Sequence, residues 1–393
     1  MPCGGFIRTM PCWEELKREG IDIDKVVREI EVLKREGVET EGIKYAGSKD
    51  KIIPYILKLV YKLEPKKVLD GFSGTTRVSQ AFAKLGYRVI ANDFAVWSKV
   101  FAECYLLNKK PKEYYQKIVD YLNNLPGRYG WFSEHYGGEP KKKGPKRPWQ
   151  IHNTMKLDAI REEIDKIAKN EIEKSVLLTS LILALDKVES TVGHYASYLK
   201  EWAPRSYKTM QLEVPKFIIS DQNHEVYQED IFNLVPKIEV DLAYYDPPYG
   251  SGNEKMPPSR VRYQAYYHIW TTIIKNDQPE LFGTTNRRVD SSDKISYSPF
   301  EDFRKNKAGK FIAMEAIEKL IQETQSKFIL FSYSSGGRVP FNDLVNAFSK
   351  KSKIIEIQEI NYKKNVMSSM RWTNEWVKEK EEPHKEYLFL LEK

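Results

Sequence analysis

The fold of this chain is decided by Val240-Asp241-Leu242-Ala243-Tyr244-Tyr245-Asp246-Pro247-Pro248-Tyr249-Gly250, an apolar run that ends in two prolines. An apolar run of this length predicts a buried strand of an α/β sheet. The prolines lack a backbone N–H, so neither strand nor helix continues through them, and they leave a stiff, extended corner. Because open α/β sheets bind their ligands at the carboxyl ends of strands, we expect the functional site at this corner.

The corner carries a carboxylate on Asp246 and an aromatic ring on Tyr249, which suits a reaction on a flat molecule with an exocyclic amino group. Asp246 can accept one N–H of that group, the carbonyl of Pro247 can accept the other, and Tyr249 can stack on the ring. The same residues also fit a proline turn at the end of a strand, with Asp246 as a helix cap. The rest of the chain has to decide between these two interpretations.

Asp-Pro-Pro-Tyr resembles the catalytic signature of amino-methyltransferases that use S-adenosylmethionine, above all the DNA adenine-N6 methyltransferases. The resemblance implies that Asp246, Pro247, Pro248 and Tyr249 are the catalytic residues. It also implies S-adenosylmethionine as the cofactor, whose methyl group is already activated, so we expect no metal. His194 agrees with this expectation, because it has no Cys or His partner at metal-ligand spacing.

Length and composition restrict the class of protein. The 393 residues suffice for a domain of ordinary size with an insertion or a small second domain. The formal net charge of +8 is a mild excess that suits a polyanionic partner. Three cysteines (Cys3, Cys12 and Cys104) form neither a CxxC site nor a disulfide framework, which favours a reducing cytoplasm. We expect neither a signal peptide nor a membrane span, because no stretch has the apolar length that either needs.

Residues 67–93 predict a strand, a glycine-rich turn, a helix and a second strand. The turn is Gly71-Phe72-Ser73-Gly74, and the second strand ends at Asp93, about 20 residues further on. This arrangement is the nucleoside-binding half of a Rossmann-like fold, in which an acid at this spacing binds ribose hydroxyls. The spacing also admits a dinucleotide enzyme, although the turn is not GxGxxG.

Three stretches resemble the cofactor motifs of the same methyltransferase family. Residues 44–49 place two lysines at a helix start, where an anion is favoured, and the resemblance implies that Lys49 pairs with the methionine carboxylate. The glycine-rich turn resembles the Phe-x-Gly motif, although the usual third glycine is replaced near Thr76. Asp230, at the end of a predicted strand over 227–232, matches the family residue that accepts a hydrogen bond from the adenine amino group of the cofactor. The implied cofactor residues are Tyr45, Lys49, Asp70, Phe72, Gly74, Asp93 and Asp230.

Two stretches combine basic and aromatic side chains, which offer phosphate contacts and stacking faces to DNA. Residues 129–149 contain a lysine-rich run, for which a solvated loop is the alternative. Residues 256–270 look like the segment after the catalytic motif in some restriction–modification adenine methyltransferases and predict a lid over a flipped base; a core helix is the alternative. The predicted DNA-binding residues are Lys141, Lys142, Lys143, Lys146, Arg147, Arg260, Arg262, Tyr263, Tyr267 and His268.

We predict an α/β chain with a Rossmann-like methyltransferase fold, a mostly parallel sheet, an antiparallel last strand and a helical and loop insertion. Apolar spacing predicts helices over 52–63, 78–85, 155–169, 171–188, 314–322 and 341–348. Further strands are predicted over 327–333, 354–360 and 387–391. We divide the chain into an N-terminal helical extension (1–42), a cofactor-binding half (43–103), an insertion for DNA recognition (104–225) and a catalytic half (226–393).

The resemblance implies a site-specific DNA methyltransferase that transfers a methyl group to adenine N6 in duplex DNA by base flipping. The expected partners are double-stranded DNA and a cognate restriction endonuclease, in the cytoplasm. Cytosine-N4 methylation uses the same chemistry, and an RNA or protein amino group is a more distant acceptor. A nicotinamide dehydrogenase built on the βαβ unit and a DNA-binding module without catalysis are the alternatives outside this class.

Overall fold

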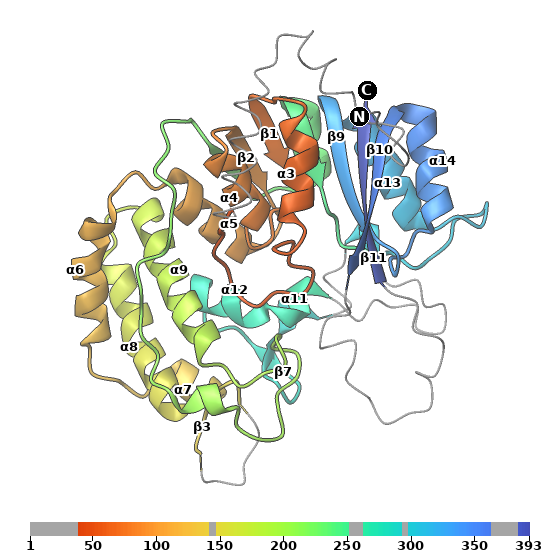
Figure 1. Cartoon of the computed structure of the whole chain (residues 1–393). Helices are drawn as coiled ribbons and strands as arrows, with labels where there is room; N and C mark the ends of the chain where they lie inside the picture. The colour runs from red at the N-terminus through yellow and green to blue at the C-terminus, as the bar shows by residue number, and fades with distance from the viewer. Residues whose placement is uncertain (1–37, 141–146, 251–261, 293–297, 363–383) are drawn as a thin grey trace, which may run out of the picture.

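A computed structural model describes residues 38–140, 147–250, 262–292, 298–362 and 384–393. Its centre is a seven-stranded sheet with the strand order β10-β11-β9-β6-β1-β2-β5 (Figure 1). The strands are β1 (Lys67–Asp70), β2 (Arg88–Asn92), β5 (Glu225–Tyr227), β6 (Glu239–Tyr245), β9 (Gln325–Ser334), β10 (Lys353–Tyr362) and β11 (His384–Glu392).

The sheet is mainly parallel, as the sequence predicts. The pairs β1–β2, β1–β6, β2–β5 and β6–β9 are parallel. Only β11, the last strand in the chain, runs against its neighbours among the described strands of this sheet, and it lies between β9 and β10. The predicted strand over 227–232 is the exception: β5 ends at Tyr227, and Asp230 caps the short helix α10 (Ile231–Leu234) by accepting a hydrogen bond from the Phe232 amide at 2.9 Å.

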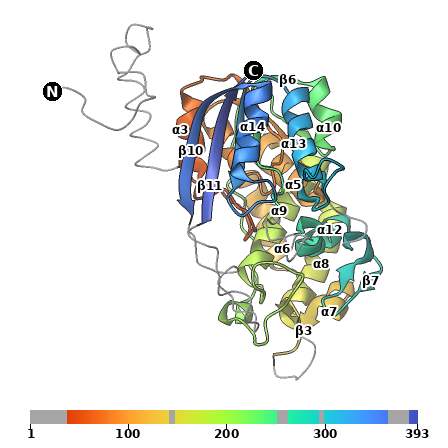
Figure 2. The same ribbon diagram turned by 90° about the vertical axis from the view of Figure 1, so that its right-hand side faces the viewer.

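Alternating side chains of the strands form two separate cores, one on each face of the sheet. Leu69, Ala243 and Ile329 belong to the core that α10, α13 (Ile312–Glu323) and α14 (Phe341–Lys351) cover. Their neighbours Val68 and Leu242 belong to the opposite core, under α3 (Ile53–Tyr61) and α4 (Arg77–Lys84). Figure 2 shows α3 and α14 on opposite sides of β10 and β11. The chain therefore has the three layers of an α/β fold.

A group of helices lies beside the sheet and has its own core (Figure 1). Its elements are α5 (Val96–Ala102), α6 (Lys112–Asn123), α7 (Trp131–Tyr136), α8 (Ile151–Ile167), α9 (Glu171–Lys187) and α12 (His268–Lys275). Ile43, Trp97 and Trp270 belong to this core although they lie outside the predicted insertion 104–225. The insertion therefore packs together with parts of both halves of the sheet domain, and the predicted boundaries stay a prediction.

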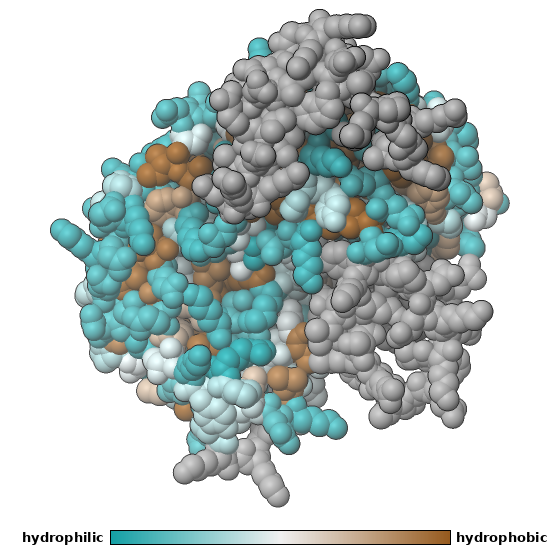
Figure 3. Space-filling view, in the orientation of Figure 1, coloured by the Kyte–Doolittle hydropathy of each residue, from teal (hydrophilic) through white to brown (hydrophobic). Residues whose placement is uncertain are grey.

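The predicted helices are found within a few residues as α3, α4, α8, α9, α13 and α14. The shorter elements include α11 (Tyr263–Tyr266) and the two-residue strands β3 (Gly137–Gly138), β4 (Trp149–Gln150), β7 (Leu281–Phe282) and β8 (Arg287–Arg288). The predicted extension over 1–42 falls almost wholly outside the described residues. In the described ranges, no helix has both the length and the apolar character to cross a membrane. Hydrophilic residues predominate on the face drawn in Figure 3.

Gly71 joins β1 to the glycine-rich turn and packs against the end of β6. Its amide donates to the carbonyl oxygen of Tyr244 at 3.0 Å. A Cβ added at Gly71 would lie 2.6 Å from two ring carbons of Tyr245. That ring cannot move aside, because Tyr245 is fully buried and its hydroxyl is 2.8 Å from the Thr324 hydroxyl.

Gly71→Ala should therefore lower the free energy of unfolding by about 1–3 kcal/mol, the usual cost of overpacking. Urea unfolding followed by circular dichroism measures this loss. Gly42→Ala is the control, because the atoms nearest to its added Cβ belong to the side chain of Arg77. Equal stability of Gly71→Ala and the wild type would contradict the packing described for β1 and β6.

Candidate active site

A cavity of about 640 Å³ opens at the carboxyl ends of the central strands. Strand β1 lies between β6 and β2, and Asp70 pairs with Tyr244 on one side and Ala91 on the other. The segments that follow these three strands consequently meet at one edge of the sheet. The cavity is lined by every residue predicted to be catalytic or cofactor-binding: Asp246, Pro247, Pro248, Tyr249, Tyr45, Lys49, Asp70, Phe72, Gly74, Asp93 and Asp230. The structure thus brings these residues together, while their roles stay predictions.

Asp93 is held at the cavity by backbone amides from two segments. Gly74 donates to Oδ2 and Ala95 donates to Oδ1, each at 2.9 Å. Gly74 has a φ of 49°, and Thr76, which stands near the family's third glycine, has a φ of 62°. The turn therefore keeps its left-handed residues although one of them carries a Cβ. Burial raises the pKa of Asp93, and the two amides counteract part of that effect.

Asp70 is a buried carboxyl group beside the turn. Ser79 donates to its Oδ2 at 2.5 Å, whereas Oδ1 has no hydrogen-bond partner in the part of the chain that the structure describes. Burial raises the pKa of Asp70 to about 7, with a smaller contribution from the negative charge of Asp93. A group that titrates so near neutrality makes the charge of the cavity dependent on pH.

Asp246 stands at the centre of the predicted catalytic corner. Burial raises the pKa of its carboxyl group well above the ordinary value, the positive charge of Lys49 lowers it, and Asp70 and Glu386 raise it further. The Lys49 Nζ is 3.8 Å from Asp246 Oδ2. Oδ1 accepts no hydrogen bond from the described residues. This oxygen is therefore available for a donor from outside the chain.

The backbone after the two prolines is fixed by β9 and the loop that follows it. The carbonyl oxygen of Tyr249 accepts hydrogen bonds from the Arg338 amide at 2.7 Å and from the Tyr333 hydroxyl at 3.1 Å. The rings of Tyr249 and Tyr333 are 4.7 Å apart. Gly250 has a φ of 63°, which lets the chain turn away after the corner. These contacts hold the Tyr249 ring against the cavity.

Glu386 is a residue of this site that the sequence analysis missed. It lies on β11, and its Oε1 is 2.9 Å from Lys49 Nζ and 2.6 Å from the Tyr249 hydroxyl. The predicted strand over 387–391 starts one residue too late to include it. Glu386 shares a sheet face with Leu388 and Leu390, so a charged residue in phase with two buried leucines was a signal that could have found it.

The residues predicted to bind DNA fall into four groups. Arg262 and Tyr263 line the cavity, whereas Arg147 is half-buried and lies away from it. Tyr267 and His268 are completely buried. The remaining predictions lie outside the described residues: Lys141, Lys142, Lys143, Lys146 and Arg260.

Burial gives Tyr267 and His268 packing roles. The Tyr267 hydroxyl accepts a hydrogen bond from the Ala46 amide at 2.6 Å, and its ring lies 4.5 Å from the ring of Tyr45. His268 Nε2 is 3.3 Å from the carbonyl oxygen of Tyr195, and burial lowers the pKa of the imidazole to about 3. Because Tyr267 offers no surface to DNA, we correct that assignment, whereas His268 also lines the cavity and its DNA contact stays a prediction. From His268 onward this segment is the buried helix α12, and residues 256–261 lie outside the described residues.

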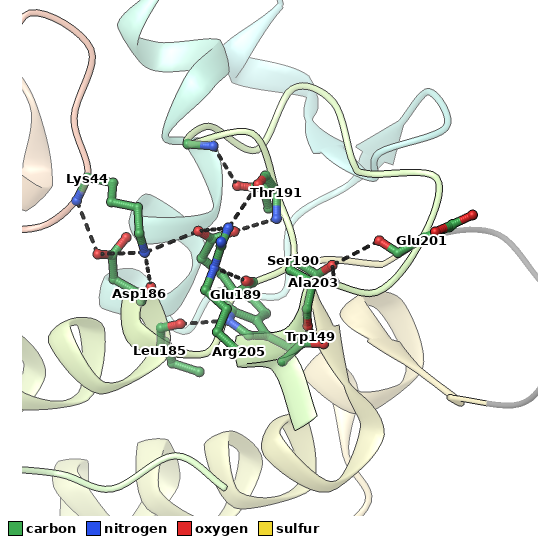
Figure 4. A network of polar contacts seen from close by, with 12 residues as sticks. Lys44, Trp149, Leu185, Asp186, Glu189, Ser190, Thr191, Glu201, Ala203 and Arg205 are labelled. Atoms are coloured by element: carbon green, nitrogen blue, oxygen red, sulfur yellow. Dashed lines mark hydrogen bonds and ion pairs between the residues drawn. The ribbon is translucent and has the colours of Figure 1, made fainter. Parts of the chain in front are cut away.

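A polar network ties the loop that carries Tyr45 and Lys49 to the end of α9 (Figure 4). The Lys44 amide donates to Asp186 Oδ2, and the Lys44 Nζ is 3.1 Å from Glu189 Oε1. A guanidinium nitrogen of Arg205 is 2.7 Å from the same oxygen of Glu189. Burial raises the pKa of Asp186 to about 6, which Lys44 counteracts. These contacts join the insertion to the loop that forms one wall of the cavity.

Searched over the described residues, the structure holds no cluster of three or more His, Cys, Asp or Glu side chains that could bind a metal ion. The acids of the cavity are instead spread along separate strand ends. Together with the turn, the proline corner and the aromatic residues, they form an acidic and partly aromatic pocket at the carboxyl edge of the sheet.

The comparisons with known proteins agree with that class of site. The sequence model of D12 class N6 adenine-specific DNA methyltransferases matches residues 45–326, well over half of the chain. The chain belongs to this family.

Individual relatives are restriction–modification methylases by name. Modification methylase StsI of Streptococcus sanguinis is 30% identical over 342 residues, which cover 82% of this chain and 48% of the relative. Modification methylase LlaI of Lactococcus lactis subsp. lactis is 28% identical, with coverages of 82% and 51%. Type II methyltransferase M.NlaIII of Neisseria lactamica is 27% identical, with coverages of 80% and 90%. The chain thus spans about half the length of the first two relatives and most of the third.

The pKa of Asp70 predicts a pH-dependent stability. Because the folded pKa of about 7 lies above the ordinary value of 3.8, the folded protein retains a proton that the unfolded chain loses. The contribution of this retained proton to the free energy of unfolding is complete at acidic pH and is lost as the pH rises through 7. Asp70→Asn should therefore gain stability relative to the wild type between pH 5 and pH 8, by on the order of a few kcal/mol.

Urea unfolding at the two pH values measures this gain. Asp221→Asn makes the same substitution at an exposed side chain and serves as the control. An equal difference between Asp70→Asn and the wild type at both pH values would show that Asp70 does not titrate in this range.

Proposed function

We propose that this chain transfers a methyl group from S-adenosylmethionine to adenine N6 in double-stranded DNA, on a Rossmann-like methyltransferase fold. The observation that carries the proposal is the joint position of Asp246-Pro247-Pro248-Tyr249 and the glycine-rich turn, which face one cavity at neighbouring strand ends. Membership of the N6 adenine-specific family supports adenine over cytosine as the acceptor.

The cavity fits S-adenosylmethionine in its chemistry. Asp93, held by two amides, would accept hydrogen bonds from the ribose hydroxyls. Asp230 would accept a hydrogen bond from the adenine amino group of the cofactor. Phe72 also lines the cavity and offers an aromatic ring to the cofactor. The positive sulfonium would be stabilised by the carboxylate of Asp70, because opposite charges attract strongly in a buried site. Lys49 is the cation of the cavity wall that would pair with the methionine carboxylate.

Asp246 and Pro247 would orient the amino group of the target base. The adenine nitrogen is a poor nucleophile, because its lone pair is delocalised into the ring. Hydrogen bonds to Asp246 Oδ1 and to the Pro247 carbonyl would favour a more pyramidal nitrogen that points at the methyl group. The cofactor supplies that methyl group as a good electrophile. Positioning provides most of the remaining rate enhancement.

Burial also prepares Asp246 to deal with the proton that nitrogen loses. As the N–C bond forms and the S–C bond breaks, the positive charge moves from sulfur to nitrogen, and one N–H proton must leave. The raised pKa of Asp246 makes its carboxylate a better proton acceptor than an exposed aspartate. Asp246 can therefore hold the proton before it passes to solvent.

Duplex DNA requires that the target adenine leave the helix, because a stacked base cannot reach the cavity. Stacking on Tyr249 would contribute about 1–3 kcal/mol to the extruded state. Arg262 and Tyr263 at the rim, together with the predicted DNA-recognition insertion, are the proposed contacts to the surrounding strand. By analogy with the named modification methylases, we propose that the protein acts in the cytoplasm within a restriction–modification system that includes a cognate restriction endonuclease.

The direct test uses purified protein, tritium-labelled S-adenosylmethionine and duplex DNA of mixed sequence, followed by digestion and identification of the labelled nucleoside. Labelled N6-methyl-2′-deoxyadenosine in the DNA digest supports the proposal. Labelled N4-methyl-2′-deoxycytidine would move the activity to the other amino base, and an unlabelled digest would exclude DNA as the acceptor.

Asp246→Ala should reduce kcat by roughly 100-fold or more. The variant loses the carboxylate that accepts a hydrogen bond from the target amino group and then takes up its proton. Cofactor affinity, measured by calorimetry, should stay within a few-fold of the wild type. Glu239→Ala on the exposed side of the same strand is the control. Wild-type turnover of Asp246→Ala would remove Asp246 from the mechanism.

Tyr249→Ala should impair methylation of a matched duplex more than that of a mismatched target, because stacking matters most when extrusion is costly. The ratio of kcat/KM on the two substrates measures the effect. Tyr249→Phe retains the ring and loses the hydroxyl contacts to Lys49 and Glu386, so its ratio should equal that of the wild type. Equal losses on both substrates for Tyr249→Ala would exclude a stacking role.

A further inference from the structure

Glu386 accepts three hydrogen bonds on a single carboxylate oxygen inside the site. Its Oε1 is 2.9 Å from Lys49 Nζ, 2.6 Å from the Tyr249 hydroxyl and 2.7 Å from the Ser332 hydroxyl. Lys49 Nζ is also 2.7 Å from the Tyr249 hydroxyl, so the lysine, the tyrosine and the glutamate form a closed triangle. Only 9% of the Lys49 side chain and 10% of the Glu386 side chain are exposed.

A carboxylate at this point of β11 is costly without compensation. Glu386 lies in phase with Leu388 and Leu390, which are buried in the sheet core. An ion pair in such surroundings rarely adds stability over an apolar pair, because both charges lose their hydration. The fold alone would be served equally well by a hydrophobic residue. The position of Glu386 against two residues of the catalytic corner indicates what the charge is used for.

The geometry points to Glu386 as a positioning residue for methyl transfer, one that holds Lys49 and Tyr249 so that the Asp246 carboxylate remains available to the target amino group. This inference rests on the proposed function. Lys49 Nζ is 2.9 Å from Glu386 and 3.8 Å from Asp246. Glu386 thus takes the short contact, and Asp246 keeps Oδ1 without a partner among the described residues.

Without the negative charge of Glu386, the Lys49 ammonium would be attracted to the nearest remaining carboxylate, that of Asp246. A short ion pair there would form at Oδ2, which Lys49 already faces, and would pull the carboxylate away from the position in which Oδ1 meets the target amino group. The hydroxyl of Tyr249 would at the same time face a neutral acceptor in place of a carboxylate, so its hydrogen bond would weaken. Glu386 therefore acts through Lys49 and Tyr249 and touches neither the base nor the methyl group.

The effect on Asp246 provides a measurement that a purely structural role would not change. Burial is the main reason for the raised pKa of Asp246; the charge of Glu386 raises it further, and Lys49 lowers it. Removing the charge of Glu386 should lower the pKa of Asp246 for two reasons. The repulsion between the two carboxylates is lost, and the Lys49 ammonium moves closer to Asp246. The acid limb of kcat/KM against pH should then move to lower pH.

Glu386→Gln preserves the shape of the side chain and removes only its charge. We expect kcat at pH 8 to fall tenfold or more and the acid limb to move to lower pH. Glu392→Gln makes the same change on the same strand, at a surface residue paired with Lys353, and should leave both quantities unchanged. In Lys49→Met/Glu386→Gln the acid limb should return toward higher pH, because the lysine that lowers the pKa of Asp246 is gone as well.

Two results would overturn the inference: wild-type turnover of Glu386→Gln, or reduced turnover with an unmoved acid limb, which would indicate a structural role only. A second measurement does not depend on transfer. The carboxyl resonance of Asp246 in protein with ¹³C-labelled aspartate, assigned by its loss in Asp246→Asn, should titrate at lower pH in Glu386→Gln than in the wild type. A wild type that methylates no adenine would remove the proposed function, whereas an unchanged titration would remove the role of Glu386.

Discussion

The parallel pairing of β1 with β6 is the constraint on which the site depends. It sets Asp70 opposite Tyr244, so the glycine-rich turn and the proline corner leave the sheet side by side. A slip of one residue would exchange the two faces of β6, moving Tyr244 and Tyr245 into the opposite cores. The two cores fix the register, because Leu242 and Ala243 are both fully buried on different faces. Gly71 lets the two segments approach closely, since any side chain there would meet the Tyr245 ring.

Much of this arrangement could be predicted from local sequence. The strand before Asp246 and the strand-turn-helix after Lys67 carry their own signals, namely apolar runs that end in glycine or proline. Parallel strands place their carboxyl ends at one edge, so predicting the strands was nearly enough to predict that Asp70, Asp93 and Asp246 share a cavity. The antiparallel orientation of the last strand could be predicted only from the resemblance to methyltransferases.

The parts that could not be predicted depend on contacts between distant segments. Glu386 reaches Lys49 across 337 positions in the chain. The alternation with Leu388 and Leu390 indicates that Glu386 faces inward, but no local pattern encodes which residue it meets there. Tyr267 shows the opposite error. Its aromatic, polar-tipped side chain suggested a surface for DNA, yet its hydroxyl accepts a hydrogen bond from the Ala46 amide inside the helical core. Composition reports what a side chain can do, and packing decides whether it is exposed.

The same contacts explain how a helical insertion can influence chemistry at the sheet. The loop over 44–49 carries Tyr45 and Lys49 into the cavity, and it is held from the insertion side by Asp186 and Glu189 through Lys44, and by Tyr267 through the Ala46 amide. A displacement of α9 or α12 would thus reach Tyr45 and Lys49, which line the cavity. Coupling of this kind needs no separate regulatory site, because the wall of the cavity is itself built from both parts of the molecule.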